Sequence, residues 1–237
     1  MRFGVSLSSD YEVRLHAALL LYSGERQTFA TYHQAGDNPG GGAPILGPAQ
    51  PLTTEFLREL CEGLGRRVRP EILPENVLVR TPESLVWWVR AQHRTMFFAE
   101  HAEDNLYAKL NGRRFPQPTL VFKVAGRELA VRALAADARP RPDTQLKMAP
   151  YWNLSPDGRC CLGSMRVPSD LSIDSVARWE QSFFESEFSH IGGALRLTKH
   201  PEGFTGLWKE LADAPGAFPL KYLAEARESL RQFVERT

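Results

Sequence analysis

The sequence predicts an α+β fold in which an antiparallel sheet is covered by helices on one face. Short β-prone runs separated by turn residues fill residues 77–135, and amphipathic helical patterns occur from residue 172 onward. A block of strands followed by helices is typical of α+β proteins rather than of alternating α/β proteins. Hydrophobic residues make up 43% of the 237-residue chain, which is enough for a substantial core.

An N-terminal β-hairpin is expected ahead of this core. Residues 11–22 and 26–34 are apolar and β-prone, and Ser-Gly-Glu separates them. Residues 36–51 are rich in Gly, Pro and Asn, which indicates a flexible loop or linker. We therefore expect residues 1–50 to form a hairpin extension with its loop, and residues 51–237 to form the core. The hairpin either extends the main sheet or forms a small separate annex.

The first helix of the core is expected to begin after Thr53 or Thr54, either of which can cap it, and to end near Leu64. Cys61 follows the core-facing Leu60 on this helix and is expected to be buried. Five strands are then expected, over residues 77–80, 85–91, 95–101, 119–125 and 128–135. The last two flank a Gly-Arg pair and form a second hairpin.

Two helices are expected after an irregular segment over residues 148–168. Ser172 can cap a helix that runs to Phe188, because apolar side chains recur there at helical spacing. This apolar stripe consists of Val176, Trp179, Phe183 and Phe184. A final amphipathic helix is expected over residues 220–234.

Charge and cysteine content argue against several classes of protein. The 29 basic and 28 acidic residues give a formal net charge of +1, so no overall field favours nucleic acid or an anionic membrane. No apolar run approaches the ~18 residues of a membrane span. The three cysteines are too few for a disulfide framework, which favours a cytoplasmic protein. No cysteine and histidine spacing fits a zinc site and no Gly-rich loop fits a nucleotide phosphate, so we expect no metal or cofactor.

Residues 149–162 (APYWNLSPDGRCCL) combine a nucleophile with a polar donor. Asn153 and Cys161 are eight positions apart, and the Ser-Pro-Asp-Gly sequence between them is typical of a turn. A chain reversal there brings the side-chain amide near the thiol. A thiolate is a strong nucleophile, and an amide N–H stabilises the oxyanion that forms when a thioester is attacked.

This pattern resembles the active site of ubiquitin-conjugating enzymes, which carry His-Pro-Asn, a turn that usually contains Gly, and a catalytic Cys followed by Leu. Asn153, Gly158, Cys161 and Leu162 match that pattern at the same Asn-to-Cys spacing. Tyr151 stands where the family has His, and is a candidate for a supporting role; the family's Pro is replaced by Trp. The resemblance implies a ubiquitin-conjugating-like antiparallel meander with helices on one face.

Nearly the full chain resembles a narrower group, the protein B family of the bacterial PRTRC gene cassette, a prokaryotic branch of the ubiquitin-conjugating superfamily. The matching segments are residues 149–153, 157–163, 166–168 and 188–190. The resemblance implies an acyl transferase, in which Cys161 accepts a ubiquitin-like protein as a thioester from a ThiF-type activating enzyme and passes it to an acceptor. It also implies that Asn153 stabilises the oxyanion, and that a metalloprotease is encoded in the same cassette.

Each residue of this site also has a structural interpretation. Cys161 is either the nucleophile or a buried small side chain, and Cys160 is the alternative thiol, although the Cys-Leu match favours Cys161. Asn153 either stabilises the oxyanion or fixes a turn. His190 is either a base for an incoming amine or a helix cap, and Asp157 either orients that amine or belongs to the turn.

Two functions follow from the resemblance. The first is a thioester-carrying enzyme, which the intact Asn153–Cys161 pair favours. The second is a catalytically silent binding module that docks the ubiquitin-like protein or its activating enzyme, which the replaced His favours. We prefer the enzyme, because a nucleophile with a positioned donor is the minimum required for acyl transfer.

Overall fold

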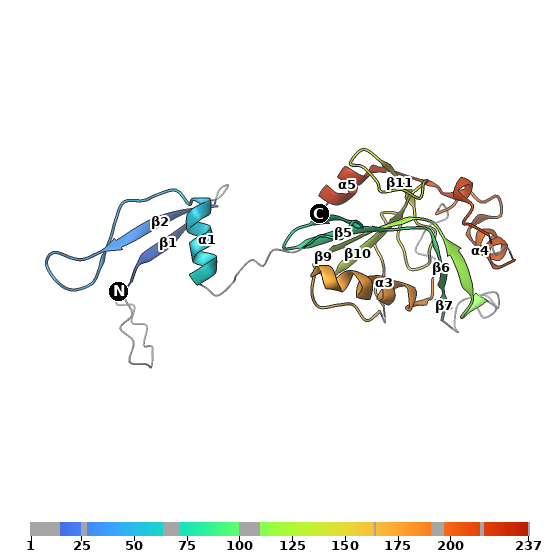
Figure 1. The fold of residues 1–237 in the computed structure, drawn as a ribbon, viewed down its shortest axis with the longest axis horizontal. Helices are drawn as coiled ribbons and strands as arrows, with labels where there is room; N and C mark the ends of the chain where they lie inside the picture. The colour runs from blue at the N-terminus through green and yellow to red at the C-terminus, as the bar shows by residue number, and fades with distance from the viewer. Residues whose placement is uncertain are drawn as a thin grey trace. The chain divides into compact units, whose positions relative to one another are not determined.

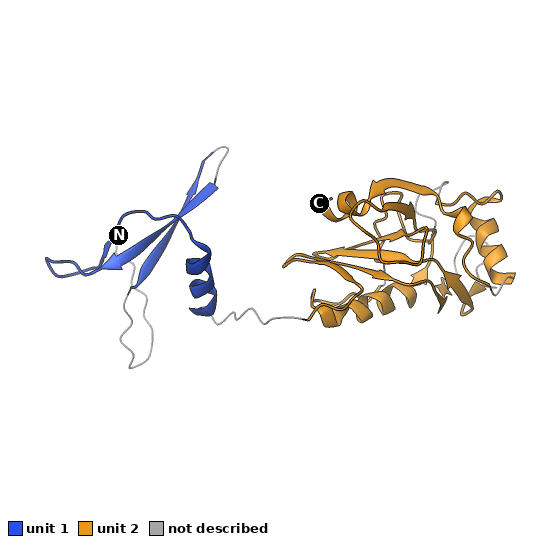
Figure 2. Ribbon diagram, turned by 45° about the horizontal axis from the view of Figure 1, so that its top comes forward, with its two compact units in different colours: residues 1–70 blue, residues 71–237 orange. Residues whose placement is uncertain are grey.

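The computed structural model describes residues 15–24, 28–63, 72–99, 110–163, 165–190, 197–213 and 216–236. The chain forms two compact units, residues 1–70 and 71–237 (Figure 2). The first unit holds the predicted hairpin, and the second holds the main sheet and the candidate site.

The first unit is a three-stranded antiparallel sheet followed by a helix. Strands β1 (Ala17–Ser23) and β2 (Thr28–Gly36) pair antiparallel, which confirms the predicted hairpin. A short strand β3 (Ile45–Leu46) pairs with the end of β2, inside the segment expected to be a loop. The predicted strand residues 11–14 lie outside the described residues.

Helix α1 (Thr54–Gly63) belongs to this first unit. The Phe56 ring packs on Tyr32 of β2 with ring centroids 4.1 Å apart, and the Phe56 N–H donates to Thr53 Oγ1 at 3.2 Å, which confirms Thr53 as the cap. The boundary between the two compact units therefore lies after residue 70, whereas the predicted boundary lies after residue 50. Cys61 is exposed, so the prediction that it is buried is wrong; α1 buries none of its side chains.

A six-stranded sheet with the order β13-β11-β10-β9-β5-β4 forms the centre of the second unit (Figure 1). All its neighbouring strands are antiparallel. Four strands confirm the predicted meander: β4 (Val77–Arg80), β5 (Ser84–Val89), β9 (Leu120–Ala125) and β10 (Glu128–Ala133). The other two are β11 (Gln145–Met148), where no strand is predicted, and β13 (Glu225–Ser229), where a helix is predicted.

Two short pairings flank the main sheet. Strand β6 (Gln92–Thr95) pairs antiparallel with β8 (Arg114–Gln117), and β7 (Phe97–Phe98) pairs parallel with β12 (Glu187–Phe188). The predicted strand over residues 95–101 is therefore divided between β6 and β7, and its last two residues lie outside the described part of the chain. Because β12 directly precedes residues 189 and 190, its pairing with β7 also positions the candidate residue His190.

Apolar side chains alternate along the strands and form two clusters, one on each face of the sheet. Helices α3 (Val176–Phe184) and α4 (Gly203–Asp213) contribute to one cluster, and the predicted stripe of α3 is buried in it. Helix α5 (Leu230–Glu235) packs Leu230 and Phe233 into the other cluster. Figure 1 shows α3 and α5 on opposite sides of the sheet. The prediction that helices cover one face is therefore wrong for α5.

The predicted helix over residues 220–234 is wrong, because this segment divides into a 3₁₀ turn (Leu220–Tyr222), strand β13 and helix α5. β13 pairs with β11 at the edge of the sheet, so ladder hydrogen bonds replace helical ones there. Ser229 then starts α5 with a capping box, in which Ser229 and Gln232 each accept a hydrogen bond from the other's N–H. Ser172 occupies the cap position before the 3₁₀ turn that leads into α3, but its side chain makes no cap bond.

Candidate active site

The segment between Asn153 and Cys161 folds back as its spacing predicts. The Gly158 N–H donates to Ser155 O at 2.8 Å, which closes a β-turn over the Ser-Pro-Asp-Gly sequence. The Cys161 N–H donates to Asn153 O at 2.7 Å, and the residues just inside this pair form an antiparallel bridge. We call residues 153–161 the cysteine hairpin.

The cysteine hairpin docks on strand β10. The Val131 N–H donates to Gly158 O at 2.8 Å, and the Cys160 N–H donates to Leu129 O at 2.7 Å. β11 pairs with the next residues of β10, Arg132 and Ala133. The hairpin therefore continues the main sheet, and its position is fixed by backbone hydrogen bonds rather than by side chains alone.

The Arg132 side chain on β10 is hydrogen-bonded to the turn of the cysteine hairpin. Its side chain is buried, and Nη1 donates to Pro156 O at 3.1 Å while Nε donates to Glu228 Oε1 of β13 at 2.6 Å. Burial lowers the pKa of the Arg132 guanidinium, and the charge of Glu228 opposes that shift. One buried cation thus joins the hairpin to the edge strand of the sheet.

The side chain of Asn153 holds a second segment against the hairpin. Its φ of 58° is left-handed, a conformation that Asn adopts more readily than most residues. Oδ1 accepts hydrogen bonds from the N–H groups of Ser189 at 3.1 Å and His190 at 3.3 Å, and Nδ2 donates to Glu187 O at 3.1 Å. The Asn153 N–H also donates to His190 O at 2.8 Å. The Asn153 side chain therefore holds residues 187–190 in place, whereas the sequence analysis considered only a local turn or an oxyanion role for it.

The two neighbouring cysteines lie in different environments. Cys161 is exposed, whereas Cys160 is half-buried and packs against the apolar core. Burial, with a smaller contribution from Cys161, raises the pKa of Cys160 to about 12. Because the thiolate is the reactive form of cysteine, Cys160 is a poor nucleophile at neutral pH.

Cys161 opens onto a pocket of about 90 Å³ that brings three of the predicted residues together. Asn153, Cys161 and His190 line this pocket with Ser189, which the sequence analysis did not single out. The remaining lining residues are Ala99, Leu162, Gly163, Ser186 and Glu187. The pocket thus contains a thiol, a carboxamide, a hydroxyl and an imidazole.

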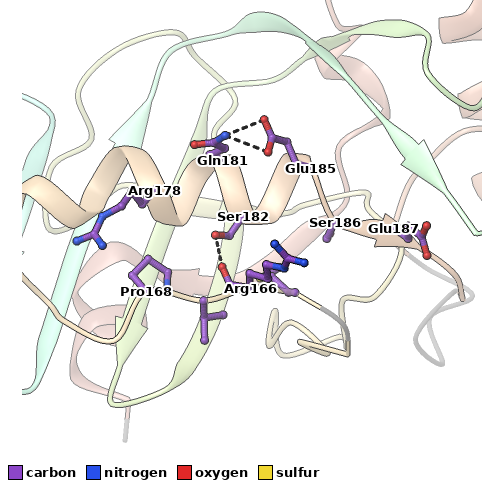
Figure 3. Close-up of a pocket in the computed structure, with 10 residues that line it drawn as sticks. Arg166, Pro168, Arg178, Gln181, Ser182, Glu185, Ser186 and Glu187 are labelled. Atoms are coloured by element: carbon purple, nitrogen blue, oxygen red, sulfur yellow. Dashed lines mark hydrogen bonds between the residues drawn. The ribbon is translucent and has the colours of Figure 1, made fainter.

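A larger groove of about 480 Å³ lies beside this pocket, between residues 165–168 and helix α3 (Figure 3). The Ser182 hydroxyl donates to Arg166 O at 2.6 Å, so a hydrogen bond joins α3 to residues 165–168 across the groove. Ser186 and Glu187 line both the groove and the pocket, so the groove leads toward Cys161.

Two of the predicted supporting residues do not line the pocket. Tyr151 is fully buried, its hydroxyl donates to Gln117 Oε1, and burial raises its pKa well above the usual value. Asp157 lies in the exposed turn, where its carboxylate accepts hydrogen bonds from the Ser155 hydroxyl and the Arg159 N–H. Partial burial raises the pKa of Asp157, but these bonds and the Arg159 charge outweigh it and lower the pKa. Asp157 therefore stabilises the turn.

The sequence carried partial signals for the two functional residues that it did not identify. Arg132 follows the apolar residues 129–131 in its strand, and a cation in such a run needs a buried partner. Ser189 adjoins His190, yet its link to Asn153 spans 36 positions and no local pattern predicts it.

The described part of the chain contains no group of three His, Cys, Asp or Glu side chains arranged to hold a metal ion. Among the helices of the described residues, none is long and apolar enough to cross a membrane.

One comparison with known proteins gave a match. A family model described as prokaryotic E2 family D matches residues 56–226, which is more than two thirds of the chain and includes the whole cysteine hairpin. Neither the search of curated proteins nor the search of solved structures found a match. The family match indicates a ubiquitin-conjugating-like function in general.

Replacing Gly158 by alanine should disrupt the docking of the cysteine hairpin. Its φ of +85° costs a residue with a Cβ about 1–2 kcal/mol. The new Cβ would also lie 2.8 Å from Arg132 Nη1 and 2.9 Å from Val131 O. Gly126→Ala is the matched control, because φ is +58° and no heavy atom lies within 4 Å of the added Cβ. In urea unfolding, Gly158→Ala should lower the free energy of unfolding by at least about 1 kcal/mol more than Gly126→Ala does. Equal losses of unfolding free energy in the two variants would contradict tight docking.

Alkylation should separate the two neighbouring thiols. With iodoacetamide at about pH 8, Cys161 should react well before Cys160, because burial raises the pKa of Cys160 to about 12. Peptide mass spectrometry over a time course measures each site, and the exposed Cys61 serves as an internal reference. In urea the difference between Cys160 and Cys161 should disappear. Equal rates in the folded protein would show that Cys160 is not protected.

Proposed function

Because the chain belongs to prokaryotic E2 family D, we propose that it carries a bacterial ubiquitin-like protein as a thioester on Cys161 and transfers it to an acceptor. The observation that carries this proposal is an exposed thiol at the end of a hairpin that is hydrogen-bonded to the main sheet. A fixed, solvent-accessible thiol is suited to accept an acyl group from one protein and present it to another.

In the first step the Cys161 thiolate attacks the thioester of the modifier on its activating enzyme. A new C–S bond forms at Cys161 as the bond to the donor cysteine breaks, and the donor leaves as a thiolate. We propose a ThiF-type activating enzyme as this donor. The overall resemblance of the chain to PRTRC protein B supports that partner, and the reducing cytoplasm keeps both thiols available.

Asn153 is the proposed donor to the oxyanion. Its Nδ2 carries two N–H groups, one of which donates to Glu187 O. Asn153 is 8% exposed, and its carboxamide is fixed by the bonds of its oxygen to residues 189 and 190. Such a preorganised donor is worth about 2.7–4 kcal/mol where one has been removed from an oxyanion hole.

The groove between residues 165–168 and α3 is the proposed path of the modifier's C-terminal tail. An extended tail in this groove passes Ser186 and Glu187 and ends at Cys161. Met165, Val167 and Pro168 offer apolar contacts, and the cations of Arg166 and Arg178 line the same groove.

A catalytically silent docking module is the second candidate. The specific observation in its favour is that Asn153 uses its oxygen and one N–H to hold residues 187–190, which is a structural role. In that case the groove and pocket bind the ubiquitin-like protein or its activating enzyme without covalent transfer.

A loading assay distinguishes the two candidates. Incubation with a ThiF-type activating enzyme, ATP and the ubiquitin-like protein should give an adduct that thiol reductant removes. Cys161→Ala should abolish the adduct and Cys160→Ala should retain it, because the pKa of Cys160 is raised to about 12. A stable complex on size-exclusion chromatography with no covalent adduct would support the docking module instead.

Filling the groove should weaken loading without changing the thiol. Gln181→Trp places an indole at an exposed groove position on α3, and Ala177→Trp is the matched control at an exposed position of the same helix outside the groove lining. We expect Gln181→Trp to raise the half-saturating concentration of loaded activating enzyme about tenfold, equivalent to about 1.4 kcal/mol. Iodoacetamide reactivity of Cys161 should stay the same. If both variants behave alike, the tail does not use this groove.

A further inference from the structure

Ser189 and His190 lie at the same pocket as Cys161, on the segment that Asn153 holds in place. β12, which precedes them, pairs with β7 and fixes one end of this segment. The Asn153 N–H donates to His190 O, so the backbone of the pair is held as well as its N–H groups. The imidazole is therefore carried on an anchored segment.

The orientation of the Asn153 carboxamide follows from its partners. One end faces the N–H groups of Ser189 and His190, and both of these can only donate. The other end faces the carbonyl oxygen of Glu187, which can only accept. The first end must be Oδ1 and the second Nδ2.

The tautomer of His190 is assigned from its hydrogen-bond partners in the same way. Ser189 Oγ lies 3.2 Å from Asn153 Oδ1 and 3.0 Å from His190 Nδ1. The carboxamide oxygen can only accept, so the single hydroxyl hydrogen satisfies that contact when Ser189 donates to Oδ1. In this assignment His190 Nδ1 carries a proton and donates to Ser189 Oγ. The opposite assignment leaves two lone pairs facing each other at the Oγ–Oδ1 contact.

This tautomer leaves the Nε2 lone pair of His190 available as a base. Building on the proposed function, we infer that His190 deprotonates a primary amine acceptor, such as a lysine side chain, and that Ser189 and Asn153 are positioning residues for it. In this hydrogen-bond chain, His190 Nδ1–H donates to Ser189 Oγ, and the Ser189 hydroxyl donates to Asn153 Oδ1.

The reaction starts from the lysine ammonium, and His190 Nε2 takes one of its protons. The neutral amine nitrogen then bonds to the thioester carbonyl carbon, and the C–S bond breaks so that Cys161 leaves as a thiolate. The thiolate takes the surplus proton from the attacking nitrogen, and the imidazolium gives its proton to water. The products are an amide and the free thiol, with no oxidant or further reactant.

The charged and titratable groups that share the pocket with His190 are Cys161 and Glu187. The Glu187 carboxylate favours a cationic acceptor, which suits lysine. A carboxylate is a weaker base than an imidazole at neutral pH, so the proton transfer is assigned to His190.

Single-turnover discharge tests this assignment. The full chain is loaded with the ubiquitin-like protein, loading is stopped, and free lysine or hydroxylamine is added. Lysine is mostly protonated at neutral pH and needs a base, whereas hydroxylamine is mostly unprotonated and does not. His190→Asn should slow discharge to lysine about 100-fold, and the loss with hydroxylamine should be much smaller.

A matched pair of variants at Ser189 tests the hydrogen-bond chain. Ser189→Ala removes the hydroxyl and should lower discharge to lysine several-fold, while Ser189→Thr keeps a hydroxyl and should restore most of the rate. Glu187→Gln should slow the discharge to lysine less than His190→Asn does. Circular dichroism and thioester loading of each variant show that it is folded.

Equal losses with lysine and hydroxylamine for His190→Asn would overturn the inference, because they indicate a purely structural role. A selective loss in Glu187→Gln but not in His190→Asn would move the base to Glu187 and overturn it as well. A wild-type chain that is never loaded on Cys161 would instead reject the proposed function.

Discussion

The structure of the site depends on one constraint, the register of the cysteine hairpin on strand β10. Two backbone hydrogen bonds, from Val131 to Gly158 and from Cys160 to Leu129, place the hairpin as a continuation of the main sheet. In an extended segment successive side chains point to opposite sides. The register that turns Cys160 toward the core therefore exposes Cys161, and a shift by one residue would exchange the two thiols.

Arg132 explains why this register is stable. Its guanidinium bonds to Pro156 O in the turn and to Glu228 on the edge strand β13, so turn and edge strand are held by one buried cation. Such an ion pair contributes little net stability compared with apolar packing, but removal of one partner leaves a buried charge and costs about 3–5 kcal/mol. The pair therefore acts against alternative placements of the hairpin, and it links the site to the C-terminal segment of the fold.

Local sequence patterns predicted the parts of the structure that local chemistry determines. The eight-residue spacing and the Ser-Pro-Asp-Gly turn correctly indicated the chain reversal, and the meander of β4, β5, β9 and β10 followed from its apolar runs. The predicted helix over residues 220–234 failed because edge pairing with β11 outweighed an amphipathic pattern, and the capping box at Ser229 starts a shorter helix. The contact between Asn153 and Ser189 depends on how β12 pairs with β7, and no short-range signal carries that information.

Tyr151 and Trp152 stand where the ubiquitin-conjugating pattern has His-Pro, and this replacement bears on the proposed function. Both side chains are buried in the aromatic core, where Tyr151 packs on Phe183 and Trp152 packs on Phe204. They fix the chain directly before Asn153 by packing rather than by a histidine. Asn153 is then held at its backbone by His190 and Cys161, and at its side chain by residues 187–190. The placement of the Asn153 carboxamide therefore depends on these contacts and not on a histidine at position 151.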